Sequence, residues 1–350
     1  MDALIRHLEE KQELAPVQVE AAAEQLLDPG LSDEKKMRLL EALAVKGETP
    51  AEIAGFVEVF LHHAVDPRLG GLEFNGPTLD VCGTGGDQLD LFNVSTTAMF
   101  IAAAAGAVVV KHGNRGITSK SGGADVLEAL GVRIDLSVDQ FRSGVEVAGL
   151  GFMFAPNYHP AFKAVVAARK ALAARGVKTL FNLIGPLLNP AKPQCQLVGV
   201  FSSDLCPVFA EILERLGRQS AWVVHGTTAD GRAVDEVSLM GPTRVVKGGV
   251  SQAWTEVEVV PRDFGLTPCE VNDLQGGDAQ QNALILTDIL SGRETGPKCD
   301  IVLINSGAAI ACAGLANDIS QGIEISREMI SSGAALHRLK LMQKVSQSAV

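Results

Sequence analysis

Residues 80–87, Asp-Val-Cys-Gly-Thr-Gly-Gly-Asp, and residues 93–96, Asn-Val-Ser-Thr, decide the fold. The first stretch places three glycines and two acidic residues at the end of an apolar run, and the second opens a helix-like segment. Glycine lets backbone N–H groups approach a ligand closely because it has no Cβ and tolerates positive φ. A helix N-terminus adds unsatisfied donors and a partial positive charge. Together the two stretches predict a phosphate cradle, and their spacing matches neither the Rossmann fingerprint nor the P-loop.

Outward from these stretches, short β-rich runs alternate with helical ones from residue 78 onward. The predicted strands are 79–82, 107–111, 151–154, 196–201, 221–225 and 301–304. The predicted helices between them include 95–105, 124–130, 160–174, 205–216 and 282–290. This alternation predicts an α/β fold with a mostly parallel central sheet flanked by helices. In such sheets ligands bind outside the carboxyl ends of the strands, which is where the glycine loop falls.

The N-terminal segment has helical patterns only. Ser32 and Thr49 are predicted N-caps, Pro50 suits the first helical position, and Glu52 completes a capping box with Thr49. Residues 66–71 read as a linker because they are rich in proline and glycine. We therefore predict a small all-helical domain over residues 1–70 and a larger α/β domain over residues 71–350.

The composition favours a globular protein that binds small molecules. Of 350 residues, 47% are apolar and 20% are charged, and the net charge is −11. An acidic protein is a poor general binder of nucleic acid, since Lys and Arg supply most of the nonspecific affinity. The longest apolar run, 97–110, is too short to span a bilayer, and the charged start lacks a signal-peptide core. The six cysteines have no metal-site spacing, so we expect reduced thiols in a cytoplasmic protein.

A second polar stretch, Lys-His-Gly-Asn-Arg-Gly-Ile-Thr-Ser, covers residues 111–119 after a predicted strand. Lys111 and Arg115 bring positive charge, and Thr118 and Ser119 add hydroxyl donors, which suits a phosphate or pyrophosphate. A solvated charged loop is the alternative interpretation. For His112, packing or hydrogen bonding is at least as good an explanation as chemistry.

Two further features are weaker when each is taken alone. The pair Asp235-Glu236 could bind Mg²⁺ together with substrate phosphates, and the hydroxyl of Ser95 could either join it or cap a helix. Adjacent acidic residues are usually only surface residues. Residues 155–160 lead into a predicted helix whose basic residues are Lys163, Arg169, Lys170 and Arg175. This basic face suits either a carboxylate ligand or contact with solvent.

Taken in order, these stretches resemble the anthranilate phosphoribosyltransferase family. The matching segments are DVCGTGGD, NVST, KHGNRGITSKSGGADVLEALG, GFMFAPNYHPAFK, TLFNLIGPLLNPA, VVHG, DEVSLMGP, LQGGDAQQNA and DIVLINSGAAIACAG. The resemblance covers nearly the whole chain. It implies that 5-phosphoribosyl 1-pyrophosphate (PRPP) and anthranilate give N-(5-phosphoribosyl)anthranilate and pyrophosphate, with Mg²⁺ as cofactor. It also implies a homodimer, an active site between the two domains, and a contribution to the helical domain from about residues 160–185.

The resemblance also implies roles for individual residues. Its PRPP site comprises Gly83, Gly86, Asp87, Asn93, Ser95, Thr96, Lys111, His112, Gly113, Asn114, Arg115, Thr118 and Ser119. Its Mg²⁺ ligands are Ser95, Asp235 and Glu236. Its anthranilate contacts are Gly83, Asn114 and Arg169. Lys111 and Arg169 are the residues expected to be catalytic.

Three departures from the family pattern stand out. Leu91 and Gly123 replace small polar residues, and the segment 170–176 is about three residues longer than usual. These departures bear on substrate affinity. Two alternatives to the transferase are a pyrimidine nucleoside phosphorylase and a non-catalytic nucleic-acid-binding relative. The first does not need a metal-binding acidic pair, and the second requires a basic groove.

Overall fold

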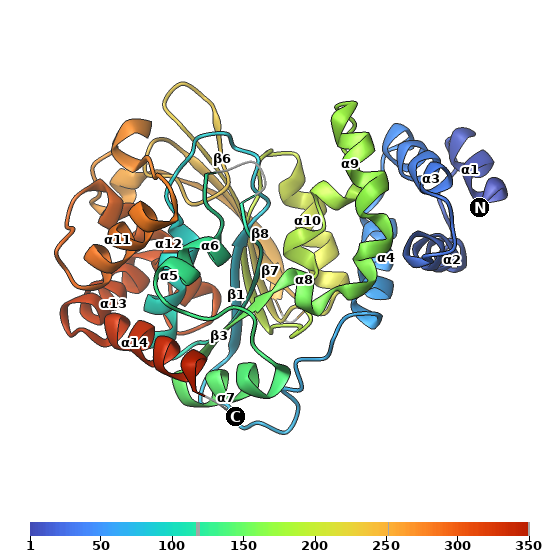
Figure 1. Ribbon diagram of the computed structural model, residues 1–350. Coiled ribbons are helices and arrows are strands. Elements are labelled where there is room, and N and C mark those ends of the chain that lie inside the picture. The colour runs from blue at the N-terminus through green and yellow to red at the C-terminus, as the bar shows by residue number, and fades with distance from the viewer. Residues whose placement is uncertain (117–119, 251, 349–350) are drawn as a thin grey trace.

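A mostly parallel sheet runs through the larger part of the protein, with helices on both of its faces (Figure 1). The computed structural model describes residues 1–116, 120–250 and 252–348. The strands are β1 (Thr78–Gly83), β2 (Val108–Gly113), β3 (Leu150–Phe154), β4 (Cys195–Gly199), β5 (Ser220–Thr227), β6 (Ala233–Val234), β7 (Thr243–Gly249) and β8 (Gln252–Val259). Their order is β3-β2-β1-β4-β5-β7-β8, and β6 pairs with β5. The first five strands in this order are parallel, whereas β6, β7 and β8 pair in antiparallel fashion.

The predicted fold class is confirmed, and so are five of the six predicted strands, which became β1 to β5. The sixth prediction, a strand over residues 301–304, is wrong because these residues lie inside helix α12 (Pro297–Cys312). That helix is buried on every side from Ile301 to Cys312, so it lacks the apolar stripe that marks an amphipathic helix. A short apolar run of this kind cannot be told from a buried strand by periodicity. The β7–β8 hairpin was not predicted.

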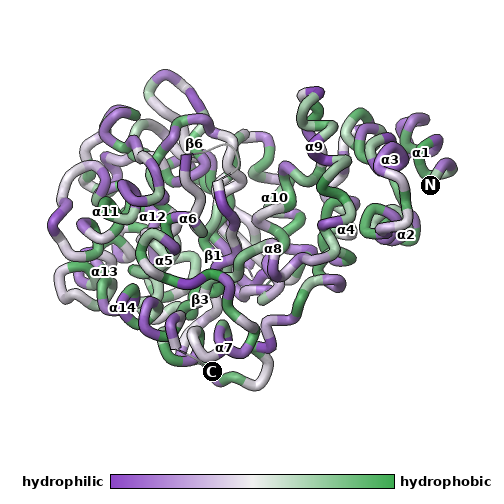
Figure 2. The backbone as a smooth tube through the Cα atoms, in the orientation of Figure 1, coloured by the Kyte–Doolittle hydropathy of each residue, from purple (hydrophilic) through white to green (hydrophobic). Residues whose placement is uncertain are grey.

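One face of the sheet carries the C-terminal helices. Its apolar core joins Leu79 and Val81 of β1 to the helices that cover this face. These helices are α5 (Val94–Ala104), α6 (Gly123–Ala129), α11 (Ala279–Leu290), α12, α13 (Ile319–Ser331) and α14 (Ala334–Gln347). Helix α7 (Val138–Ala148) packs on β3 and α14. Hydrophilic residues colour many of the peripheral loops (Figure 2).

The opposite face of the sheet packs on α10 (Leu205–Arg215) and the helical bundle, with Cys82 of β1 in the shared core. The bundle comprises α1 (Asp2–Glu9), α2 (Pro16–Leu27), α3 (Asp33–Lys46) and α4 (Pro50–His62). Helix α9 (Val166–Ala174) contacts α3, and the preceding turn η1 (Pro160–Val165) contacts α2, so this later segment lies against the bundle (Figure 1). The other short helices are α8 (Ala155–Tyr158), η2 (Leu180–Asn182), η3 (Gly185–Leu187), η4 (Pro261–Phe264) and η5 (Val271–Leu274).

The predicted helix caps of the bundle are confirmed. Ser32 caps α3, and Thr49 and Glu52 form the capping box of α4. Thr49 Oγ1 accepts a hydrogen bond of 3.2 Å from the Glu52 amide, and Glu52 accepts one of 2.8 Å from the Thr49 amide. The Glu52 carboxylate also forms an ion pair of 2.7 Å with Lys46, and both side chains are almost fully buried. The sequence signal was strong here because it combined a cap, a proline and an acid at fixed spacing.

Two expectations from composition concern the chain as a whole. All six cysteines are free, and Cys269 is the one that keeps partial exposure. In the part of the chain that the structure describes, no helix is long and apolar enough to cross a membrane.

Candidate active site

The glycine loop that follows β1 lies against the Asp235-Glu236 pair. Gly85 and Gly86 have φ values of 71° and 92°, the left-handed region that glycine adopts without strain. The Gly85 amide donates a hydrogen bond of 2.7 Å to Asp235 Oδ2. At Gly83 a Cβ would lie 2.4 Å from the same oxygen, so a glycine is required for Asp235 to approach β1. The structure thus gives Gly83 a role in admitting the carboxylate.

Helix α5 presents its first turn to this loop. Asn93 is the N-cap residue, but its side chain makes no capping hydrogen bond. Asn93 instead donates to the carbonyl of Ser121 at 3.1 Å and accepts from Asn282 at 2.9 Å. The first turn of α5 therefore has no side-chain cap from Asn93, and the Ser95 amide donates instead to the Glu236 carboxylate. This arrangement suits an anionic ligand at the helix N-terminus.

Lys111 lies at the carboxyl end of β2 and connects β1 to α5. Its side chain is buried, and its ammonium group donates to the carbonyl of Val81 and, over 3.3 Å, to the hydroxyl of Ser95. A Cβ at Gly123 would lie 2.9 Å from Thr96 Oγ1 and 3.9 Å from Lys111 Cε. The position where the sequence departs from the family pattern therefore faces the predicted phosphate site.

Three carboxylates crowd around the same place. Burial and the charge of Asp87 raise the pKa of Asp235 to about 7. Burial, followed by the charge of Asp235, raises the pKa of Glu236 well above its usual value, and Lys111 and the Ser95 amide partly offset this. Burial also raises the pKa of Asp87, despite a hydrogen bond from the backbone. Burial and charge repulsion thus both favour the protonated forms of these carboxyl groups.

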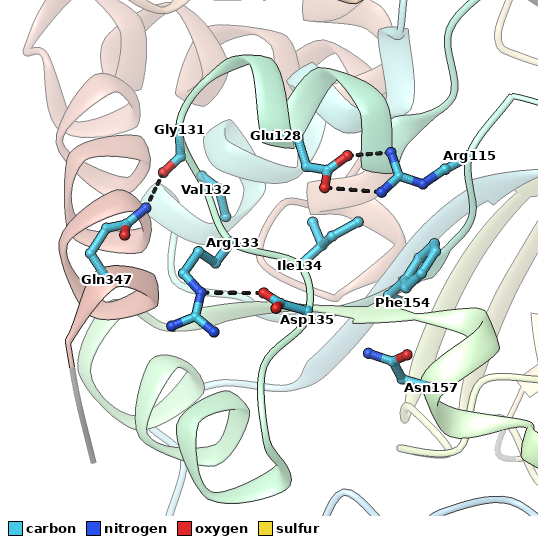
Figure 3. Close-up of a pocket in the computed structure, with 10 residues that line it drawn as sticks. All are labelled: Arg115, Glu128, Gly131, Val132, Arg133, Ile134, Asp135, Phe154, Asn157 and Gln347. Atoms are coloured by element: carbon cyan, nitrogen blue, oxygen red, sulfur yellow. Dashed lines mark hydrogen bonds and ion pairs between the residues drawn. The ribbon is translucent and has the colours of Figure 1, made fainter.

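Arg115 does not turn toward Lys111. Its guanidinium group forms an ion pair of 3.1 Å with Asp125 and a bidentate ion pair with Glu128 on α6. Figure 3 shows Arg115 among the residues that line a pocket, which also include Phe154. The pocket has a volume of about 500 Å³, and the Arg115 guanidinium carbon lies 5.5 Å from the centroid of the Phe154 ring. Asn114, the preceding residue, is exposed. The predicted contacts Thr118 and Ser119 lie outside the described residues.

Asp125 holds the ends of this loop together, a role that the sequence analysis missed. One of its oxygens accepts hydrogen bonds from the amides of Gly116 at 2.9 Å and Gly122 at 2.8 Å, and the other accepts from Arg115. Asp125 lies in the first turn of α6, as expected for a residue that opens this helix. The available signal was an acid three residues after a glycine that precedes a helix.

A chain of rings on the other face of the sheet joins two predicted site residues. Because side chains alternate along β2, His112 points away from Lys111. Its ring lies 5.1 Å from His159, which stacks on Phe162 at 5.0 Å. Phe162 meets Phe181 at 5.6 Å, and the Arg169 guanidinium lies 4.6 Å from the Phe181 ring centroid. Sequence reasoning did not assign a role to the two phenylalanines, since aromatic residues usually belong to the core.

Burial keeps these histidines neutral. Desolvation, followed by the neighbouring His159, lowers the pKa of His112 to about 3, and desolvation lowers that of His159 to about 4. Burial also lowers the pKa of Arg169. Among the described residues no carboxylate lies within ion-pair distance of Arg169, whereas Arg175 at the end of the same helix pairs with Glu41. The basic stretch is therefore divided between Arg169, which lies over the Phe181 ring, and Arg175, which forms an ion pair.

The remaining departure, Leu91, is half-buried against the core of the α/β domain and forms a bridge with Gln275. The sheet edge thus brings together Lys111, Ser95, Thr96, the glycine loop and the acidic pair. Arg169 and His112 lie on the side of the helical bundle.

Comparisons with known proteins agree with this arrangement. Residues 75–336 match a family model described as glycosyl transferase family, a/b domain, and residues 2–64 match its helical bundle domain. The fold and the site thus define a glycosyl transferase built from these two domains.

Two similar proteins indicate which glycosyl transferase family the chain belongs to. The anthranilate phosphoribosyltransferase of Rubrobacter xylanophilus is 45% identical over 95% of this chain and 94% of its own length. That of Alkaliphilus metalliredigens is 43% identical over 99% of this chain and 97% of its own. The chain belongs to the anthranilate phosphoribosyltransferase family, as its motifs predicted. The phosphorylase and nucleic-acid-binding alternatives are not favoured.

Solved structures give the same result. The anthranilate phosphoribosyltransferase of Thermus thermophilus superposes with a TM-score of 0.89 at 35% identity, with 99% of each chain covered. The Saccharomyces cerevisiae enzyme in complex with PRPP and Mg has a TM-score of 0.86 at 26% identity, again with 99% of each chain covered.

Proposed function

We propose that this chain transfers the phosphoribosyl group of PRPP to the amine of anthranilate in tryptophan biosynthesis, with release of pyrophosphate. The observation that carries this proposal is the position of Lys111, the first turn of α5 and the Asp235-Glu236 pair at the carboxyl ends of β1 and β2. N–H donors, a buried ammonium group and paired carboxylates suit a pyrophosphate that carries a divalent cation. The family of the chain supports the same reaction.

PRPP is proposed to bind along the strand ends and the first turn of α5. The proposed contacts are Gly83, Gly86, Asp87, Asn93, Ser95, Thr96, Lys111, His112, Gly113, Asn114, Arg115, Thr118 and Ser119. Support is strongest for Ser95, Thr96 and Lys111, which lie close to one another. Arg115 needs to leave Asp125 and Glu128 in order to reach a phosphate.

The residues present fit a Mg²⁺ ion. Burial and the charge of Asp87 raise the pKa of Asp235, and burial and the charge of Asp235 raise that of Glu236. A bound cation would favour the ionised form of both carboxylates. Ser95 completes the proposed ligand set. Within the described residues no group of three His, Cys, Asp or Glu side chains is arranged to hold a metal ion by itself. The proposed ion would therefore take its other ligands from substrate phosphates and water. Bound Mg²⁺ would neutralise charge on the leaving pyrophosphate.

Arg169 is proposed to bind the anthranilate carboxylate, with Gly83 and Asn114 as further contacts. The guanidinium group lies over the Phe181 ring and has no ion-pair partner in the described chain, so its charge is available. An Arg fork matches a carboxylate in geometry and charge. The adjacent rings of Phe162 and Phe181 offer an apolar surface for an aromatic substrate.

Catalysis then rests mainly on positioning and charge. Departure of pyrophosphate leaves positive charge on the ribose and negative charge on the leaving group, which Lys111 and the α5 amides face. The amine of anthranilate is neutral near pH 7 and needs no strong base. His112, with a pKa of about 3, is uncharged near neutral pH and cannot act there as a proton donor. Its proposed role is packing or hydrogen bonding.

The family also supports proposals about organisation. We infer a homodimer formed through the helical domain, located in the cytoplasm. We place the domain boundary between residues 70 and 71, with residues from about 160 to 185 contributing to the helical domain. The packing of α9 on α3 supports that contribution.

A comparison of two reactions tests the proposal. The protein is incubated with anthranilate, PRPP and Mg²⁺, and separately with thymidine or uridine and phosphate, and the products are separated by chromatography. We expect N-(5-phosphoribosyl)anthranilate in the first mixture and no free base in the second. Phosphorolysis without transfer would contradict the proposal.

A further inference from the structure

Asn305 is a polar side chain in the middle of the buried helix α12. Its exposure is 0%, and it lies within the run from Ile301 to Cys312 that is buried on every side. Its side-chain oxygen accepts a hydrogen bond of 2.8 Å from the Val237 amide, while its nitrogen donates to the Val237 carbonyl at 2.9 Å and to the Ile301 carbonyl at 2.8 Å. A primary amide in such a core costs free energy unless it is bonded in this way.

Val237, to which Asn305 is hydrogen-bonded, directly follows the acidic pair in the chain. The Val237 amide belongs to the peptide bond with Glu236, so the hydrogen bond to Asn305 fixes the plane of that peptide. On the strand side the same segment lies very close to the sheet, because a Cβ at Gly199 would fall 1.5 Å from the Asp235 carbonyl oxygen. The backbone of Asp235 and Glu236 is thus held in place by the sheet on one side and by α12 on the other.

A fixed backbone matters here because Asp235 Oδ2 also accepts the Gly85 amide and the Asp235 carbonyl lies against Gly199, so a shift of this segment would disturb both contacts. Two hydrogen bonds from one amide set distance and orientation together, which a single bond or an apolar contact does not.

We propose that Asn305 is a positioning residue that holds the Asp235-Glu236 backbone in the geometry that binds the cation and pyrophosphate. This inference rests on the proposed function. Asn305 touches neither substrate nor metal; it acts through Val237. Residues that orient a metal ligand commonly change metal affinity by about tenfold or more when they are replaced.

The test compares Asn305→Leu, which keeps the branched shape of the side chain and removes the three hydrogen bonds, with Ser306→Ala. Ser306 is the next residue on α12, is equally buried, and bonds to Ser326 on α13. Calorimetry measures binding of PRPP with Mg²⁺, and assays give kcat and the Mg²⁺ concentration for half-maximal rate. We expect Asn305→Leu to raise both the Kd for PRPP and the Mg²⁺ concentration for half-maximal rate by about tenfold. We expect Ser306→Ala to change each of these quantities by less than about twofold.

If Asn305→Leu does not fold, Asn305→Asp replaces it, since Asp keeps an acceptor for the Val237 amide and loses the two donated bonds. We expect a smaller shift in the same direction. Wild-type PRPP binding and Mg²⁺ dependence in a folded Asn305 variant would overturn the inference while leaving the proposed function intact. Failure of the wild-type protein itself to bind PRPP with Mg²⁺ would overturn both.

Discussion

The carboxylate of Asp235 accepts a hydrogen bond from the backbone amide of Gly85, with 2.7 Å between nitrogen and oxygen. The two residues are 150 positions apart in the chain. Their contact joins the glycine loop after β1 to the acidic pair, two features that predicted a phosphate cradle and a cation site separately. A change in either element should therefore affect the other.

The acidic pair is expected to be essential for turnover. The double variant Asp235→Asn with Glu236→Gln removes both negative charges and keeps the shape of the side chains. At millimolar Mg²⁺ we expect the rate to fall by at least about 100-fold. The matched control is Asp230→Asn, an exposed acid nearby that pairs with Arg232. If the double variant kept the wild-type rate, the cation would have to bind at residues other than Asp235 and Glu236.

A methyl group at Gly83 should disturb the site without unfolding the protein. The Cβ would lie 2.4 Å from Asp235 Oδ2, so the carboxylate must move. For Gly83→Ala we expect kcat/KM for PRPP to fall by about tenfold to 100-fold, because small misplacements of catalytic groups are costly. Gly70→Ala is the control, since nothing lies within 4 Å of that Cβ. Equal kinetics in the two variants would show that the close approach is unimportant.

Restoring a hydroxyl at position 123 should improve substrate binding. The side chain at Gly123 would extend toward Thr96 and Lys111. One added hydrogen bond of about 1 kcal/mol would lower the KM for PRPP in Gly123→Ser by about fivefold. Gly123→Ala separates the two effects, since its methyl group lies close to Thr96 without offering a donor. An unchanged or higher KM in Gly123→Ser would mean that this position does not serve the substrate.

Arg169 should affect one substrate selectively. Arg169→Lys keeps the charge but loses the planar fork and its contact with Phe181. A charged hydrogen bond contributes about 1.5 to 3 kcal/mol, so the KM for anthranilate should rise about tenfold or more while that for PRPP stays near wild type. The control is Arg175→Lys, because Arg175 forms an ion pair with Glu41. A larger effect on PRPP than on anthranilate would reassign Arg169.

The sequence predicted those elements whose signals are local. Strand β1 is a short, largely apolar run that ends in a glycine, and α4 begins with a complete capping box. The run 301–304 was misread because α12 is apolar on every side. The β7–β8 hairpin was missed although residues 256–259, Glu-Val-Glu-Val, alternate between polar and apolar residues, a pattern that indicates a strand.

The candidate site was predicted in its parts and less well in its assembly. Glycine and hydroxyl residues at strand ends carry a local signal. The hydrogen bonds between Asn305 and Val237 join residues 68 positions apart, and no pattern in the sequence predicts them. The same holds for Arg115, since its pairing with Glu128 depends on how α6 packs. Burial and long-range contacts decide these details.

The most direct test of the central claim follows the fluorescence of anthranilate in the presence of the protein, PRPP and Mg²⁺. We predict a steady loss of fluorescence that requires all three additions and releases one pyrophosphate for each anthranilate consumed. Unchanged fluorescence at high protein concentration, with PRPP and Mg²⁺ saturating, would contradict the proposed function.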